Sequence, residues 1–169
     1  MTLVRRARSQ DANILCNAEK YWAERPGHLV SLAEELKPES FAHKIDELNE
    51  ESSGLYIVAE SESGEVLGHA LLDPIGLSRL SHIVRLTIVV HPGFTSKGIG
   101  HLLMEKLVSW AKQSKKVEKI ELLVRATNEQ AVALYKKFGF VEEGLLRNRI
   151  RLDKEKYIDD LIMGLFLRP

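Results

Sequence analysis

The pattern of apolar and polar positions along the chain predicts seven β-strands. Runs in which apolar residues alternate with polar ones, or follow one another without interruption, are typical of half-buried and fully buried strands. A turn at residues 61–65 joins two of these runs as a hairpin, and residues 153–156 separate the last two as an antiparallel pair. The expected strands cover residues 2–8, 55–60, 66–72, 83–90, 117–124, 143–152 and 157–167.

Helical spacing predicts four helices between these strands. Two helical stretches fill residues 10–51, where Ser9 or Asp11 can cap the first and a Pro-containing break at residues 25–27 and another at residues 37–38 interrupt them. Thr127 and Gln130 have the spacing of a capping box for the fourth helix, and Gly139 ends it. The third and fourth helices are indicated by the apolar sets Ile99, Leu102, Leu103, Leu107, Trp110 and Ala131, Leu134, Tyr135, Phe138.

The order of these elements, β-α-α-β-β-β-α-β-α-β-β, predicts a mixed three-layer α/β fold. It favours neither a doubly wound dinucleotide-binding fold nor an α/β barrel, because three consecutive strands precede the first glycine turn. A chain of 169 residues is long enough for one domain with a sizeable core and too short for two ordinary ones. We therefore expect a single domain over residues 1–169.

The glycine turn after the strand at residues 83–90 is the most informative stretch. Gly98 and Gly100 open directly onto the third helix, so unpaired backbone N–H groups and the positive end of a helix dipole meet at one place. Such a place binds phosphate-like anions, and Ser96 and Lys97 can add a hydroxyl and a positive charge. The P-loop and dinucleotide patterns fit poorly, and one Gly-x-Gly is equally consistent with a tight strand-to-helix turn.

Composition excludes several classes of function. The chain is 44% hydrophobic and 28% charged, and 24 basic residues balance 24 acidic ones. Zero net charge argues against non-specific binding of nucleic acid or of anionic membranes. The absence of a long apolar run and of a signal-peptide pattern, together with a single cysteine, Cys16, favours the cytoplasm. The histidines lack ligand spacing with cysteine or carboxylate, so no metal site is expected.

Two segments resemble the motifs of the GNAT superfamily of acetyl-CoA-dependent N-acetyltransferases. The glycine turn is similar to its motif A, and residues 128–140 are similar to its motif B, Asn-x-x-Ala-x-x-Leu-Tyr-x-x-x-Gly-Phe. The two motifs cover about a third of the chain in the family's order, and motif B is the more specific. The chain departs from the family at Thr95, where Arg or Gln usually stands, and Lys97 is the available replacement for that charge.

The resemblance implies a coenzyme site. In the family, the strands before motifs A and B run parallel and splay apart, and acetyl-CoA lies in the splay with its pyrophosphate on the helix that begins at the glycine turn. Its pantetheine arm would follow the end of the preceding strand, and its acyl group would point toward motif B. The residues that this places at the coenzyme are Ile88, Val89, Val90, Thr95, Ser96, Lys97, Gly98, Ile99, Gly100, Asn128 and Tyr135.

Acetyl transfer from a thioester needs a neutral amine, a stabilised oxyanion and a proton for the leaving thiolate. The resemblance assigns the last role to Tyr135, although its place on an apolar stripe also suits simple packing, and Asn128 also suits a helix cap. A backbone N–H of Val89 or Val90 is the expected oxyanion donor. The general base stays open between His82, Glu121 and solvent water.

The predicted function is transfer of an acetyl group from acetyl-CoA to a primary amine, by direct attack in a ternary complex. The acceptor is expected to be a small molecule, an amino acid or a protein N-terminus, and a homodimer is a further expectation. The alternative is a non-catalytic sensor that binds acyl-CoA, which Thr95 and the lack of a glutamate in the strand at residues 83–90 permit.

Overall fold

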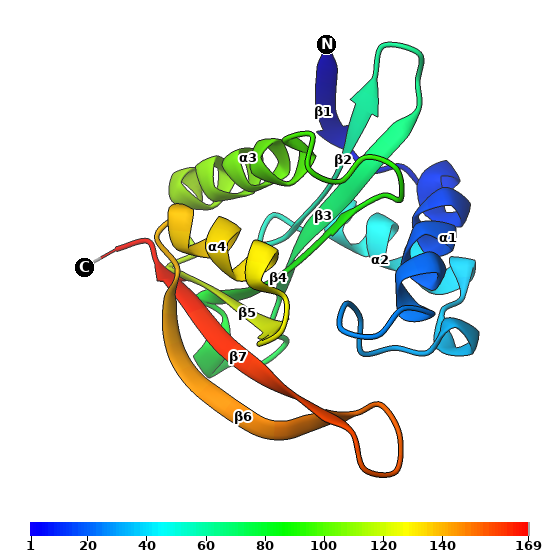
Figure 1. Ribbon diagram of the computed structural model, residues 1–169. Coiled ribbons are helices and arrows are strands. Elements are labelled where there is room, and N and C mark those ends of the chain that lie inside the picture. The colour runs from blue at the N-terminus through cyan, green and yellow to red at the C-terminus, as the bar shows by residue number, and fades with distance from the viewer. Residues whose placement is uncertain (169) are drawn as a thin grey trace.

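The computed structural model describes residues 1–168 and contains seven strands and four α-helices in the predicted order (Figure 1). Three short 3-10 helices lie between them, at Ser9–Asp11, Ala33–Glu35 and Ser78–Leu80. The helices are α1 (Ala12–Ala23), α2 (Pro38–Glu50), α3 (Ile99–Gln113) and α4 (Glu129–Lys137). The strands are β1 (Thr2–Arg6), β2 (Leu55–Ser61), β3 (Val66–Pro74), β4 (Ile83–Val90), β5 (Lys119–Arg125), β6 (Val141–Arg151) and β7 (Tyr157–Phe166).

All seven strands form one sheet in the order β1-β2-β3-β4-β5-β7-β6. Every neighbouring pair is antiparallel except β4 and β5, which run parallel. The predicted mixed sheet of about seven strands is therefore confirmed. The parallel pair joins an antiparallel half that begins at β1 to a second half formed by β5, β7 and β6.

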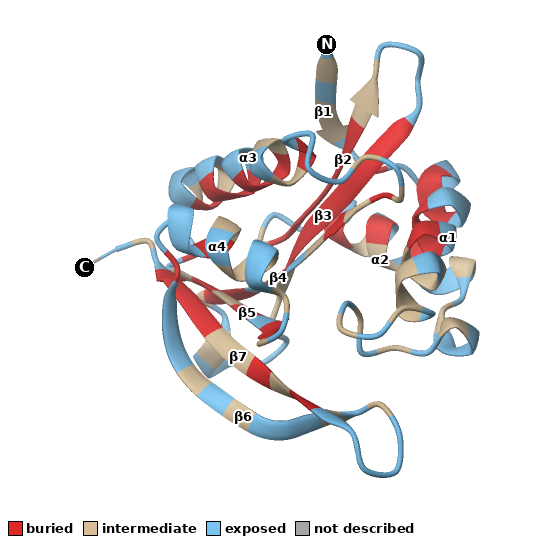
Figure 2. Ribbon diagram, in the orientation of Figure 1, coloured by how far each residue is buried: buried red, intermediate tan, exposed pale blue. Residues whose placement is uncertain are grey.

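Helices cover the sheet on two sides, which confirms the three layers. The larger core packs α3 and α4 against β2 to β5 and β7, around the fully buried Leu103, Leu107 and Ile120. The smaller core packs α1 and α2 against β2 and β3, around Leu15 and Ile45. Figure 2 shows these buried residues concentrated in the strands and on the sheet-facing sides of the helices.

Local sequence signals set several element boundaries as predicted. Pro38 occupies the first turn of α2, where its missing N–H costs no helical hydrogen bond. Gly139 ends α4 with φ of 94°, a conformation that side chains with a Cβ rarely adopt. The cap of α4 differs from the prediction, because Asn128 and not Thr127 precedes the first helical residue. Its Oδ1 atom accepts a hydrogen bond from the Ala131 N–H at 3.2 Å, as the alternative interpretation of Asn128 had it.

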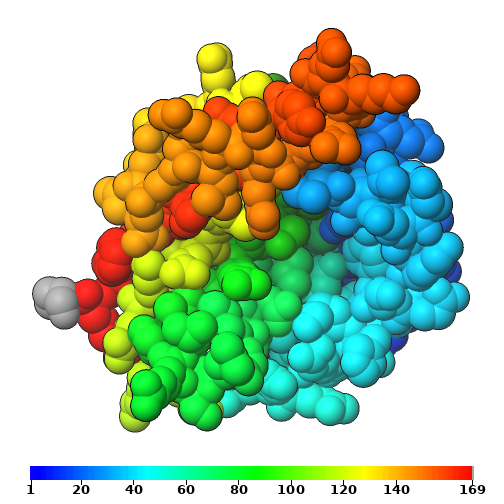
Figure 3. Space-filling model, turned by 90° about the horizontal axis from the view of Figure 1, so that it is seen from below, coloured from blue at the N-terminus to red at the C-terminus, as the bar shows by residue number. Residues whose placement is uncertain are grey.

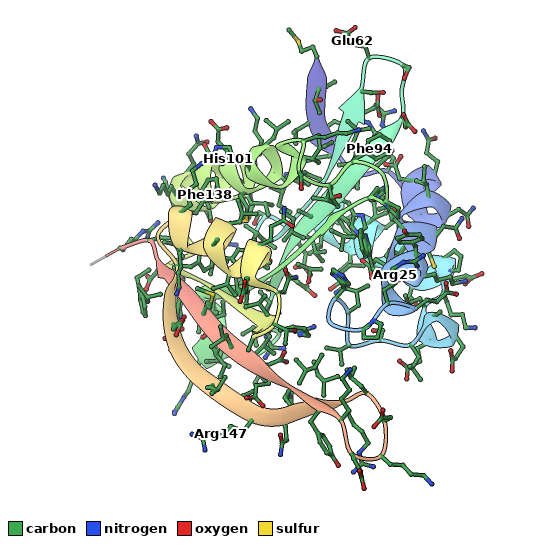
Figure 4. All side chains as sticks on the ribbon, viewed as in Figure 1. Arg25, Glu62, Phe94, His101, Phe138 and Arg147 are labelled. Atoms are coloured by element: carbon green, nitrogen blue, oxygen red, sulfur yellow. The ribbon has the colours of Figure 1, made fainter. Side chains whose placement is uncertain are left out.

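Strands β6 and β7 form a long curved arm that extends away from the helices (Figure 1). The pairing register shifts between Leu146 and Ile150, where Asn148 has φ of 50° and its N–H donates to the Asp159 carboxylate at 2.7 Å. Arg147, on this bulged segment, points outward from the arm in Figure 4. Within residues 1–168, no helix combines the length and the apolar character that crossing a membrane requires.

Candidate coenzyme and acyl-transfer site

The parallel strands β4 and β5 pair only at their beginning. Their register runs Ile83 with Lys119, Val84 with Ile120 and Arg85 with Glu121, and then stops. β4 continues to Val90 and β5 to Arg125 while each stays paired to its outer neighbour. We call the space between residues 86–90 and residues 122–125 the β4–β5 gap. It leaves backbone N–H and C=O groups of β4 free to pair with a ligand.

The hydrogen-bond pattern fixes which residues of β4 face the gap. His91 donates its N–H to the Leu67 carbonyl of β3 at 2.9 Å. Since backbone groups alternate in direction along a strand, Val89 also pairs with β3, and Ile88 and Val90 direct theirs into the gap. Of the two expected oxyanion donors, only Val90 therefore presents its N–H to the gap. The side chains of Ile88 and Val90 are half-buried against the core that contains α3.

The glycine turn places the start of α3 beside this gap. Gly98 is the N-cap with φ of 81°, and no side chain caps the helix, so its first N–H groups are available. Open space surrounds the Cβ position of Gly98, as expected for a residue that a ligand approaches. Gly100 differs, because a Cβ there would lie 3.2 Å from Leu134 Cδ2 of α4. Gly100 is therefore needed for helix packing, and any ligand contact it makes is through its N–H.

Polar groups around the turn are exposed. Thr95, Ser96 and Lys97 all lie at the surface, and Ser96 has φ of 60°. The Ser96 hydroxyl accepts a hydrogen bond from Gln130 Nε2 at 3.3 Å, which ties the turn to the start of α4. The Ile99 side chain is buried in the core, so a ligand reaches only its backbone. The ring of His101, in the first turn of α3, packs 4.9 Å from that of Phe138 at the end of α4 (Figure 4).

Tyr135 lies in α4 and is 7% exposed, with its ring 5.8 Å from that of Phe140. Burial raises the pKa of its phenol to about 12, although the charge of Arg125 works in the opposite direction. No described residue forms a hydrogen bond with the hydroxyl, yet no side-chain polar atom is both fully buried and without a partner. The hydroxyl therefore keeps access to open space and stays protonated at neutral pH, as a proton donor must.

The segment after α1 forms the other wall of the site, and the sequence interpretation missed the residues that hold it. Arg125, at the end of β5, donates to the His28 carbonyl at 3.2 Å and to the buried Asp160 carboxylate at 2.6 Å. Trp22 donates its ring N–H to the Val90 carbonyl at 2.9 Å, and its ring lies 4.6 Å from that of His28. The sequence did carry a signal for the Arg125–Asp160 pair, since each of these charged residues stands next to the apolar run of a strand.

A hollow of about 420 Å³ lies between this segment and the start of α4. The space-filling view shows a depression bounded by the arm, by the residues around α1 and α2, and by the central strands (Figure 3). The hollow brings Asn128 together with the segment that Arg125 anchors. Its lining residues are Pro26, Gly27, His28, Thr127, Asn128, Glu129 and Gln130.

The two side chains considered as general base lie elsewhere. The Glu121 carboxylate accepts a hydrogen bond from Lys119 Nζ at 2.9 Å and stands at the last paired position of the strands. His82 precedes β4, and its carbonyl accepts hydrogen bonds from the N–H groups of residues 118 and 119. At about 3.3 Å per residue, His82 is roughly 23 Å along the strand from Val89. Neither side chain reaches the unpaired end of the gap.

The chain is similar to known N-acetyltransferases. The chain is 28% identical over 127 residues to the L-amino acid N-acetyltransferase AaaT of Escherichia coli, covering 75% of this chain and 78% of the relative. It is 30% identical over 140 residues to an N-alpha-acetyltransferase of Sulfolobus acidocaldarius, covering 77% and 82%. The fold matches that of YncA from Salmonella typhimurium, solved with acetyl-CoA, with a TM-score of 0.89, 16% identity and coverage of 100% and 95%.

The model of the acetyltransferase (GNAT) family matches residues 17–140, which include both glycine-containing motifs, the β4–β5 gap and Tyr135. The family resemblance inferred from the sequence is thereby confirmed. The chain belongs to the acetyltransferase (GNAT) family and is an acyltransferase.

Proposed function

We propose that this protein transfers an acetyl group from acetyl-CoA to a primary amine, by direct attack of the amine on the thioester in a ternary complex. The observation that carries the proposal is the β4–β5 gap, which opens beside the uncapped start of α3. The amides of a pantetheine arm suit the free backbone N–H and C=O groups of Ile88, and a pyrophosphate suits the N–H groups that follow Gly98. Lys97 supplies a positive charge at the same place.

Val90 of the gap and Tyr135 of α4 provide two of the three requirements of the reaction. The Val90 N–H, directed into the gap, donates to the oxyanion that develops on the attacked carbonyl. The Tyr135 hydroxyl, protonated and without a hydrogen-bond partner among residues 1–168, donates a proton to the leaving thiolate. Asn128 keeps its amide NH₂ free for the acyl arm because only its Oδ1 atom caps α4.

Direct attack is supported by the state of the single cysteine. The Cys16 side chain is fully buried in the core between α1, α2 and the sheet, and burial raises the pKa of its thiol. A buried, protonated thiol is a poor nucleophile, so a covalent acetyl-cysteine intermediate has no support. The amine therefore receives the acetyl group without transfer through the protein.

The names of the relatives support an α-amino group as acceptor. The Escherichia coli relative is named for L-amino acids, and the Sulfolobus acidocaldarius relative for N-alpha-acetylation. We therefore propose that amino acids and protein N-termini are the first acceptors to test, with small amines such as polyamines next.

Release of free thiol from acetyl-CoA, measured with a panel of amino acids, N-terminal peptides and polyamines, tests the proposed function. Thiol release that depends on the amine supports it. Binding of acetyl-CoA without thiol release for any amine would instead favour the sensor.

The Tyr135→Phe variant tests the proton donor. The change keeps the ring and its packing on Phe140, so we expect kcat to fall on the order of 10²-fold with little change in the KM for acetyl-CoA. The exposed Tyr21→Phe variant is the matched control. Wild-type turnover in a folded Tyr135→Phe protein would remove Tyr135 from the mechanism.

A further inference from the structure

Three ionisable side chains form a hydrogen-bonded chain between α1 and the sheet. His69 Nε2 lies 2.9 Å from Glu19 Oε1, and His69 Nδ1 lies 2.8 Å from His91 Nε2. His69 is fully buried and His91 is 3% exposed. Burial of two imidazoles and a carboxylate costs free energy unless hydrogen bonds replace water, and neither helix packing nor the coenzyme site requires these residue types.

The chain lies on the side of the sheet opposite α3. Gly68 of β3 faces α3, since its Cβ position meets Ile99 and Leu103. Successive residues of a strand face opposite sides of the sheet, so His69 faces α1 and α2. The register of β3 and β4 sets His69 opposite Val89, about 5.5 Å away between Cα atoms. Thr87, two residues earlier on the same face of β4, is exposed. The chain therefore borders the open face beside the gap.

Glu19 is the end of the chain that reaches this open face. Its side chain is 14% exposed, and its second carboxylate oxygen, Oε2, has no hydrogen-bond partner among residues 1–168. One turn further along α1, Trp22 donates to the carbonyl of Val90, which places this side of the helix at the unpaired end of β4. Glu19 and Trp22 are three residues apart on α1, so Glu19 lies on the side of the helix that faces the unpaired end of β4.

The hydrogen-bonded row of Glu19, His69 and His91 has room for one more proton. The Glu19 carboxylate accepts at one end, and the Val66 backbone favours a proton on His91 at the other. Three hydrogen bonds in this row need three ring protons, and two neutral imidazoles carry two. When His69 donates to His91 and His91 donates to the backbone, the missing proton is the one between His69 and Glu19. One added proton therefore completes the row at its accessible end.

We propose that Glu19 is the general base of this enzyme, that His69 holds the carboxylate and takes up the proton, and that His91 positions His69. This inference rests on the proposed acetyl transfer. Burial, and then the charge of His69, lower the pKa of His91 to about 3, so the added proton stays on His69 beside Glu19.

The protons of the reaction balance in this scheme. An ammonium acceptor gives one proton through Glu19 to His69, and its nitrogen then bonds to the acetyl carbon. The carbon–sulfur bond breaks, and Tyr135 protonates the sulfur. Tyr135 regains the second proton of the nitrogen, and the chain releases its proton to solvent.

The side chains of Tyr56, Cys16 and Phe41, which lie around the hydrogen-bonded row, carry no charge at neutral pH. Tyr56 of β2 lies with its ring 6.2 Å from His69, and burial raises the pKa of its phenol. Burial likewise raises the pKa of Cys16 on α1, where the charges of residues 19, 20, 37 and 39 act in both directions. From α2, the Phe41 ring lies 6.5 Å from the His69 ring, and a phenyl ring has no titratable group. Both Tyr56 and Cys16 are therefore neutral at the pH of the assay.

The Glu19→Gln variant tests the base. The amide keeps a hydrogen bond with His69 Nε2, as donor to the neutral ring or as acceptor from the protonated ring, so folding and the affinity for acetyl-CoA should change little. We expect kcat/KM for the amine to fall on the order of 10²-fold at neutral pH. The loss should shrink as pH approaches the pKa of the amine, because more amine arrives without its proton. Glu50→Gln, an exposed carboxylate at the end of α2, is the control and should match the wild type.

A loss that is equal at every pH and accompanied by a lower melting temperature would show a structural role and overturn the proposal. Wild-type kcat/KM in Glu19→Gln would do so directly. Histidine ring NMR of the unmodified protein gives a second test that does not depend on a variant folding. His91 should stay neutral over the whole acidic limb of kcat/KM, and a protonated His91 ring in that range would also overturn the proposal. Absence of thiol release in the wild type would instead refute the proposed function itself.

Discussion

Replacement of Asp160 by Asn should destabilise the fold and weaken the site at the same time. Asp160 is 1% exposed and Arg125 is 7% exposed, and their hydrogen bond of 2.6 Å joins two buried charges. Removal of one partner of a buried ion pair leaves the other charge uncompensated, which costs about 3–5 kcal/mol. We take about 3 kcal/mol, because the amide oxygen of Asn can still accept from Arg125 Nε.

For a chain of this length, that loss lowers the melting temperature by about 6–12 °C. Urea unfolding followed by circular dichroism measures the free-energy change, and Asp159→Asn is the control. The neighbouring Asp159 carboxylate is half-buried, and among the described residues only the Asn148 N–H donates to it, which an amide oxygen can also accept. Its variant should therefore lose less than about 1 kcal/mol.

A second variant separates stability from function. Replacement of the whole pair, as Arg125→Met with Asp160→Leu, removes both buried charges and should restore most of the lost stability. It also removes the hydrogen bond to the His28 carbonyl, so binding of the amine should stay impaired. Asp160→Asn with wild-type stability, or a double variant with wild-type kcat/KM, would refute the reasoning.

The glycine turn gives two further predictions. Gly98→Ala should cost only about 1 kcal/mol of stability, because its Cβ meets open space at a positive φ. The same variant should weaken acetyl-CoA binding, measured by calorimetry. Gly100→Val should mainly destabilise the fold, by about 1–3 kcal/mol, through its contact with Leu134. The reverse ranking in unfolding and binding experiments would contradict these roles. Lys97→Ala should weaken acetyl-CoA binding by about 1.5 kcal/mol at low ionic strength and by less at high salt, and a salt-independent effect would exclude a phosphate contact.

Local signals in the sequence predicted the fold well. Gly98 and Gly139 mark a helix start and a helix end because each conformation is set by the residue itself and its neighbours. The strand at residues 83–90 was placed at its observed bounds for the same reason. The cap of α4 was misplaced by one residue, since Thr127 and Asn128 are both good caps and only the path of the chain after β5 selects Asn128.

Contacts between distant residues were not predictable from one sequence. Arg125 pairs with a residue 35 positions away, and Glu19 with one 50 positions away. Helical spacing shows that Glu19 lies on α1, but the approach of α1 to β3 is decided by packing of the whole smaller core. The proposed coenzyme turn could be predicted because all its parts are contiguous. The side chains around the proposed acceptor site could not, because they come from α1, β3, β5 and β7.

The β4–β5 gap gives the sheet an internal edge in addition to the two outer edges at β1 and β6. Charged side chains such as Arg147, Arg149 and Arg151 discourage other chains from pairing along β6, whereas Ile88 and Val90 offer no such protection. A strand-like ligand would therefore complete the sheet in the way a missing strand does. Amide exchange at these two residues should then slow when the ligand binds, and so report occupancy of the site without any measurement of turnover.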